Sequence, residues 1–269
     1  MIADVDVAAV RLLSSPVAVM EKYFRYELRE LSHMPRGATL IVGNHSGGKL
    51  PVDMFLFARR WYEHFQWQRP LRFLAHDTLM KIAKTSLNRI GAVHASPANA
   101  HQIFERDEAL AVFPGGEYET FRPYSERYKV DFSGRTGFAR LALKARVPVT
   151  PIVTAGSHEL FFILTRGEKL GRLLGMKKFF RFSGFPISLG FPFGLYLGPL
   201  PSPFPLPAKI TAQVLEPVHL WKEERDHRAY SEDDLTDHAA LKEMSLVVQN
   251  RMQLAMDILA SERRFPVIG

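Results

Sequence analysis

The chain contains no cysteine. Disulfide bonds, thiolate nucleophiles and cysteine-ligated zinc are therefore excluded. No two histidines show a metal-binding spacing such as His-x-x-x-His, so we expect no metal site. Neither Ser46 nor Ser157 lies in the Gly-x-Ser-x-Gly pattern of serine hydrolases. Any catalysis by this chain is expected to use other side chains.

Long hydrophobic segments are missing as well. The longest uncharged run, Phe182–Ala208, contains seven prolines, and a helix facing lipid could not satisfy its backbone through them. The first ten residues hold Asp4 and Asp6 and no Lys or Arg, unlike a secretory signal. We therefore expect a cytoplasmic protein that contacts membranes only peripherally.

Positive charge predominates, with a formal net charge of +7 and a pI of about 9.6. No cluster of Lys and Arg stands out, so nucleic acid is not an expected partner. A basic surface suits anionic lipid headgroups or phosphorylated substrates, although a basic protein can also lack any polyanionic partner.

The order of apolar segments predicts an α/β fold with a largely parallel central sheet flanked by helices. Apolar residues recur at helical spacing over Val7–Leu31, where Pro16 predicts a kink or a break. The predicted strands are Ala38–Gly43, Leu71–Ala75, Gly91–His94, Ala109–Phe113, Val147–Thr154 and Lys209–Leu215, and the later predicted helices are Pro51–Phe65, Thr78–Asn88, Pro97–Arg106, Gly134–Arg146 and Asp237–Ser261. The prolines in Val147–Thr154 predict an irregular or edge strand.

All 269 residues fit one domain. Residues 1–33 form an N-terminal helical segment that either lies on a membrane or packs on the domain. Residues 34–269 form the α/β part. The uncharged, Phe-rich and Pro-rich stretch Phe179–Pro207 is expected to form an acyl-binding groove, a loop that dips into a membrane, or an irregular cover over the core.

Two loops follow predicted strands, where parallel sheets place their functional residues. The first, Gly43–Lys49, matches the opening of a phosphate-binding P-loop, but Leu50 and Pro51 replace the Ser or Thr that would hold magnesium. His45 in this loop suits a general base at neutral pH, and Asp53 could fix its tautomer. On its own, a loop histidine can also have no role.

The second loop, Phe113–Glu119, has paired glycines that allow backbone N–H groups to approach a ligand closely. Arg122, Arg127 and Arg135 follow, and arginine binds phosphate or carboxylate through two hydrogen bonds. A tight turn before a solvated charged loop would look the same.

Taken together, the two loops resemble the lysophospholipid/glycerolipid acyltransferase superfamily. That family has an Asn-His…Asp block, a later Phe-Pro-Glu-Gly-type block and then a strand containing Val-Pro. The matching segments are Asn44-His45…Asp53, Phe113–Glu117 and Val147–Ile152, within a resemblance that covers about Ala38 to Gly156. The Gly-Gly-x-x-Glu form is similar to the branch that acylates mono- and diacylglycerols.

The resemblance implies that His45 deprotonates an acceptor hydroxyl, that Asp53 orients His45, and that the hydroxyl attacks a thioester directly. It places acceptor binding on Gly115, Gly116 and Glu117, with Arg122 as an addition. The donor would be acyl-CoA or acyl carrier protein, acting as a co-substrate with no further cofactor. The acceptor would be a glycerolipid or lysophospholipid at a membrane surface.

The chain also departs from the family pattern. Seven residues separate His45 from Asp53 instead of the usual four, Gly115 replaces the glutamate after Phe-Pro, and an arginine usual near Gly91–His94 is missing. Two alternatives therefore stay open. One is a lipid or thioester hydrolase that uses the same base, and the other is a non-catalytic lipid-binding protein.

Overall fold

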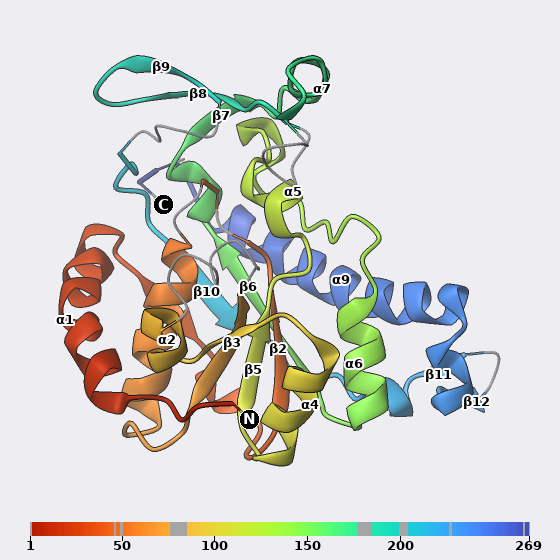
Figure 1. Ribbon diagram of the computed structural model, residues 1–269. Helices are drawn as coiled ribbons and strands as arrows, with labels where there is room; N and C mark the ends of the chain where they lie inside the picture. The colour runs from red at the N-terminus through yellow and green to blue at the C-terminus, as the bar shows by residue number, and fades with distance from the viewer. Residues whose placement is uncertain are drawn as a thin grey trace.

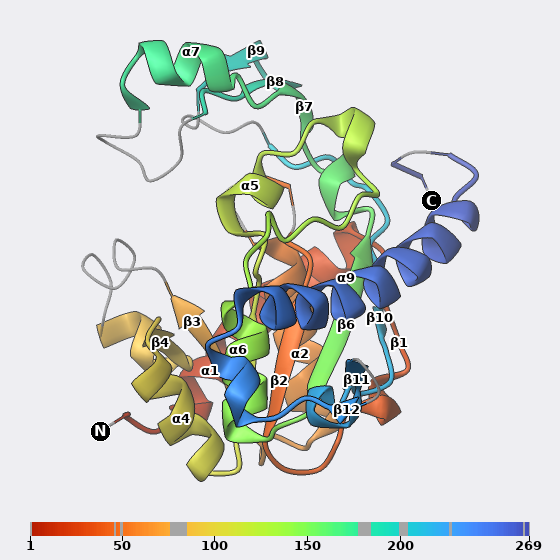
Figure 2. The same ribbon diagram turned by 90° about the vertical axis from the view of Figure 1, so that its right-hand side faces the viewer.

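A seven-stranded sheet with helices on both faces forms the centre of the molecule (Figures 1 and 2). The computed structural model describes residues 2–45, 47–48, 51–75, 85–176, 184–198, 204–225, 228–265 and 267–268. The strands in spatial order are β1 (Glu27–Arg29), β10 (Thr211–Val214), β6 (Val149–Ala155), β2 (Thr39–Gly43), β5 (Ala109–Val112), β3 (Leu71–Ala75) and β4 (Ala92–His94). All neighbours are parallel except β10 and β6. The predicted α/β class with a largely parallel sheet is confirmed.

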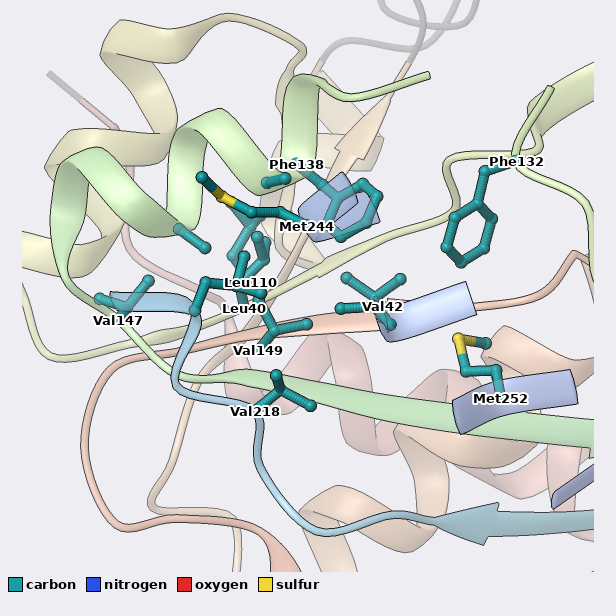
Figure 3. Packing of buried hydrophobic residues seen from close by; sticks show 14 of the residues in the cluster. Leu40, Val42, Leu110, Phe132, Phe138, Val147, Val149, Val218, Met244 and Met252 are labelled. Carbon is teal, nitrogen blue, oxygen red and sulfur yellow. The ribbon is translucent and has the colours of Figure 1, made fainter. Parts of the chain in front are cut away.

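Helices cover the sheet because its strands are apolar on both faces. In β2, Leu40 and Val42 pack into the cluster that includes residues of α4, α6 and α9, and Figure 3 shows them there. Ile41 points the opposite way, into the cluster under α1 and α2, because successive strand residues face opposite sides. The larger helices are α1 (Val7–Tyr23), α2 (Val52–His64), α4 (Pro97–Glu105), α6 (Gly137–Ala145) and α9 (His238–Ser261).

The N-terminal segment forms a single helix that packs on the domain. The Asp6 carboxylate caps α1 by accepting the N–H of Ala9 at 3.0 Å. The helix runs through Pro16 without splitting and ends at Tyr23. The prediction of helix as far as Leu31 is wrong for its last part, because Glu27–Arg29 pairs with β10 as an edge strand.

Strand β6 lies between β10 and β2, so the prediction of an edge strand is wrong. The residues of β6 that pair with β10 run from Ala155 to Ile152. Pro151 lies just beyond the last of these pairs, where it is tolerated. The carbonyl of Pro151 still accepts the N–H of Leu215 at 2.9 Å. The N–H that proline lacks is therefore not needed for any of the registered hydrogen-bonded pairs between β6 and β10.

A second, three-stranded antiparallel sheet was not predicted from the sequence. It consists of β7 (Phe162–Thr165), β8 (Ile187–Gly190) and β9 (Gly194–Leu197), and α7 (Glu168–Leu173) lies between β7 and β8 in the chain. Figures 1 and 2 show this part standing out at the end of the domain where α5 (Gly116–Thr120) lies. A short hairpin, β11 (Glu224–Arg225) and β12 (Arg228–Ala229), completes the set.

Two further expectations can be compared only with the residues that the structure describes. The predicted helix Thr78–Asn88 falls largely outside them, and its residues 85–88 are helical. Among the helices that the structure describes, none is long and apolar enough to cross a membrane.

Candidate active site

Three neighbouring parallel strands send their following loops to the same edge of the sheet. β2 pairs with β5 on one side and β6 on the other, both in parallel register. The carboxyl ends of β2, β5 and β6 therefore lie at the same place. They are followed there by residues 44–45 and 47–48 after β2, residues 113–116 after β5 and residues 156–159 after β6. Both loops that the sequence singled out lie here.

The loop after β2 is held at both ends by hydrogen bonds. The side chain of Asn44 donates to the carbonyl of Thr154 at 3.0 Å and accepts the Thr154 N–H at 2.8 Å, which extends the pairing with β6 by one step. Farther along, Gly48 donates its N–H to the carbonyl of Thr120 at 2.9 Å. Gly48 has a φ of +78°, and a Cβ there would overlap the ring of Phe161. This position therefore requires glycine.

Between these ends, the backbone of His45 is fixed by a buried carboxylate. The N–H of His45 donates to Glu119 Oε2 at 2.9 Å. The other oxygen of Glu119 accepts from Arg122 Nη2 at 2.9 Å and from the N–H of Asp131 at 3.2 Å. Burial raises the pKa of Glu119 above its ordinary value, while Arg122 and the two backbone N–H groups oppose that rise.

The paired glycines make room for this carboxylate. A Cβ on Gly115 would lie 2.1 to 2.2 Å from Cγ, Cδ and Oε2 of Glu119. Gly115 therefore lets the Glu119 side chain fold back toward His45. Phe113, just before the glycines, lies with its ring centroid 5.3 Å from that of His45. The Phe-Pro-Gly-Gly loop thus contributes to positioning the imidazole.

Arg122 provides unused hydrogen-bond donors at this place. Its side chain is fully buried and pairs with Glu119. Its Nε and Nη1 have no hydrogen-bond partner among the residues that the structure describes. A buried donor without a partner costs free energy, so these two N–H groups suit an anionic or carbonyl oxygen of a bound molecule.

His158 lies at the site in the short helix that follows β6. The ring is buried beside the backbone of His45 and Gly47, with its Nδ1 3.1 Å from where a Cβ of Gly47 would lie. Burial, reinforced by the positive charge of Arg122, holds the pKa of His158 well below its usual range. The imidazole is therefore neutral at neutral pH.

The predicted site residues lie in different surroundings. Asp53 is buried in the first turn of α2, at the far end of the His45 loop, and accepts the N–H of Met54 at 2.9 Å. Gly115 and Arg122 lie in the cluster with Glu119, whereas Gly116 lies against the guanidinium of Arg135. Glu117 is exposed. The glutamate that contacts His45 is Glu119, which ends the Gly-Gly-x-x-Glu form.

An apolar cavity of about 210 Å³ lies along α2, from Met54 to Tyr62. Its walls come from α1, α2 and β3, and Met54 and Phe55, next to Asp53, are among them. Arg59 and Ser14 are its main polar neighbours and bond to each other at 2.6 Å. Such a space suits a hydrocarbon chain and offers little to a polar ligand.

Within the described part of the chain, no three His, Asp or Glu side chains are grouped as a metal site would require.

Comparisons with known proteins agree with the motifs. Residues 25–155 match the Acyltransferase family. The crystal structure of the 1-acyl-sn-glycerophosphate (LPA) acyltransferase PlsC from Thermotoga maritima superposes with a TM-score of 0.52 over 91% of this chain and 79% of that one, at 16% sequence identity. At that identity the likeness shows the fold.

Curated relatives extend the match along the chain. An uncharacterized protein of Mycobacterium tuberculosis is 29% identical over 91% of this chain and 64% of its own length. The human protein named "DGAT1/2-independent enzyme synthesizing storage lipids" is 33% identical over 71% of this chain and 57% of its own length. The chain therefore spans less than two thirds of these relatives.

The depressed pKa of His158 predicts a loss of stability in weak acid. The unfolded chain binds a proton on this histidine below about pH 6.5, whereas the folded chain does not. The contribution of neutral His158 to the free energy of unfolding is therefore complete above about pH 6.5. Below that pH it falls by up to about 1.4 kcal/mol per pH unit. Denaturant unfolding of the parent and of His158→Asn between pH 7.5 and 5 should give stability curves that diverge below pH 6.5. Parallel curves would contradict a neutral, buried His158.

Proposed function

Since residues 25–155 match the Acyltransferase family, we propose that this chain transfers a fatty acyl group from a thioester to a glycerolipid hydroxyl, with His45 as the general base. The observation that carries this proposal is the fixed backbone of His45. Glu119 holds its N–H and Asn44 anchors the loop to β6. A general base needs such a defined position to reach one hydroxyl proton.

The proposed reaction proceeds in one chemical sequence. His45 takes the proton from the acceptor hydroxyl as the oxygen attacks the carbonyl carbon of the thioester. The carbon–sulfur bond then breaks, and the departing sulfur receives the proton from the His45 imidazolium. The acyl group passes directly to the lipid, which agrees with a chain that has no cysteine to carry it.

Asp53 would orient the imidazole by accepting its second ring N–H. The position of Asp53, buried at the start of α2, supports this role because the loop that carries His45 leads directly into that helix. A carboxylate there would also stabilise the imidazolium that forms during transfer.

Arg122 would bind an oxygen of one substrate with its two unused N–H groups. A phosphate on the acceptor is the strongest ligand for a guanidinium, whereas relatives named for storage lipids favour a neutral acceptor. Acyl-CoA or acyl carrier protein would be the donor. Gly115, Gly116 and Glu117 remain predicted substrate contacts.

The acyl chain would lie in the apolar cavity between α1 and α2. Two of the residues that line this cavity, Met54 and Phe55, directly follow Asp53 in the chain, which supports a chain whose thioester end reaches toward the His45 loop.

We expect purified protein to release thiol from a long-chain acyl-CoA in mixed micelles only when a suitable lipid hydroxyl is present. Lysophosphatidic acid, monoacylglycerol and diacylglycerol form the acceptor panel. His45→Ala should lower the rate by about 10²- to 10⁴-fold, the contribution of a positioned base. The exposed His101→Ala serves as the control. Release without any acceptor would show a hydrolase instead, and an unchanged rate in His45→Ala would remove His45 as the base.

Gly115→Ala tests the support that Glu119 gives to His45. The added methyl displaces the Glu119 carboxylate and so breaks its bond to the His45 N–H. Loss of that charged hydrogen bond should lower kcat by about 10- to 100-fold. The matched control is Gly137→Ala, where a Cβ meets open space. Equal kcat values for the two variants would show that Glu119 does not support catalysis.

Filling the cavity should change the choice of acyl chain. Ala58→Phe places a ring in the space between α1 and α2. Each methylene that loses its buried place costs about 0.8 kcal/mol, or about fourfold in kcat/KM. Long-chain thioesters should therefore lose activity while short-chain ones keep it, measured as kcat/KM against chain length. Exposed Ala8→Phe is the control, and a profile identical to the parent would place the chain elsewhere.

A further inference from the structure

The small antiparallel sheet has an unusual distribution of polarity. Its outward face carries Leu189, Leu195 and Leu197, which are 40%, 55% and 54% exposed. These residues belong to the cross-strand pairs Leu189↔Leu195 and Ile187↔Leu197. The pair between them, Ser188↔Tyr196, faces inward and is buried. A sheet with one face in water normally turns its polar residues outward, so this face is built for contact with something apolar.

The tip of the hairpin continues that face. Phe191 and Phe193, in the turn between β8 and β9, are 68% and 78% exposed. Phe204 packs beside Phe191, with ring centroids 6.5 Å apart, and is itself exposed. Residues 162–204, called here the outer lobe, contain ten of the nineteen large apolar side chains that are exposed among the described residues. Figures 1 and 2 show no described helix or strand over the hairpin.

Charge identifies the occupant of this face. Residues 162–204 include six basic residues and one acidic residue, a net charge of +5 within a chain of +7. Lys169 and Arg172 belong to this set and lie in α7, whereas Arg166, just before it, pairs with Glu126. Exposed aromatic and aliphatic side chains together with excess positive charge are typical of segments that insert into an anionic bilayer surface. A symmetric contact with a second copy would instead bring two such charges together.

The outer lobe is also continuous with the candidate active site. β7 begins three residues after Glu159, the end of the short helix that carries His158. Phe161, just before β7, packs against Gly48 of the His45 loop. A lobe seated in a bilayer would therefore hold the entrance of the site at the lipid surface.

We propose that the apolar face of β8 and β9 docks the protein on anionic membranes, with Phe191 and Phe193 entering the bilayer interface. The proposed function supplies the reason for docking, namely access to a lipid hydroxyl, but the docking itself rests on the lobe alone. Of the three expectations for Phe179–Pro207, this proposal adopts the membrane-dipping loop and assigns it to β8, β9 and the turn between them.

Single labelled cysteines test this directly, because the chain has no cysteine of its own. Phe193→Cys, Leu12→Cys on α1 and Leu254→Cys on α9 each receive an environment-sensitive fluorophore at a position at least 66% exposed. Vesicles of phosphatidylcholine with phosphatidylglycerol should shift the emission of the Phe193→Cys label to the blue and protect it from an aqueous quencher. The other two labels should not respond. A response at Leu12→Cys without one at Phe193→Cys would overturn the proposal in favour of α1.

Vesicle flotation provides the second measurement. Phe193→Gln/Leu197→Gln should reduce binding to anionic vesicles by at least about tenfold, whereas Leu254→Gln/Ile258→Gln, a matched exposed pair on α9, should bind like the parent. Equal binding by the lobe variant would overturn the proposal. A dimer in solution that only the lobe variant loses would also overturn it, because the face would then belong to a second copy.

Activity separates this proposal from the proposed function. The lobe variant should keep the parent's acyl transfer in detergent micelles and lose it on vesicles. If the parent protein binds vesicles through the lobe but transfers no acyl group, the proposed function is refuted and the docking proposal stands.

Discussion

The carboxylate of Glu119 joins the loop that carries His45, 74 residues away in the sequence, to two nearer groups at the edge of the sheet. One oxygen accepts the N–H of His45, and the other accepts from Arg122 and from the N–H of Asp131. A buried carboxylate is unfavourable unless its lone pairs are satisfied. The same three bonds that offset its burial therefore fix the loop that carries the proposed base. Gly115 is part of this arrangement, since any side chain there would expel the carboxylate.

Around this contact the site combines charge and burial in a particular way. Arg122 neutralises Glu119 and keeps two donors in reserve, and its positive charge helps to keep His158 neutral. An apolar cavity lies between α1 and α2, and the outer lobe carries exposed apolar residues. These are the two places where the proposals put the acyl chain and the bilayer.

The sequence predicted the α/β class and the two loops because each depends on local patterns. Apolar runs alternate with helical spacing, and glycine or asparagine follows the strands. It misplaced β6 because Pro151 suggested an edge, and only the register with β10 shows where the missing donor is tolerated. The short strands β8 and β9 were not predicted because Leu189, Leu195 and Leu197 face outward, against the usual pattern. Glu119 was passed over for Glu117, although the Gly-Gly-x-x-Glu spacing pointed to it. Which of the two glutamates turns inward depends on the contact with the His45 loop, which is 74 residues away in the chain.

Direct transfer of the acyl group at the His45 site is the central claim, and a single-turnover experiment tests it. Enzyme in excess over a thioester with a labelled acyl group is mixed with lipid acceptor and quenched at short times. The account predicts that label moves from thioester to lipid with no labelled protein at any time and no labelled free fatty acid. Label that appears on the protein before it reaches the lipid would contradict direct transfer, and label that accumulates as free fatty acid would show that water is the true acceptor.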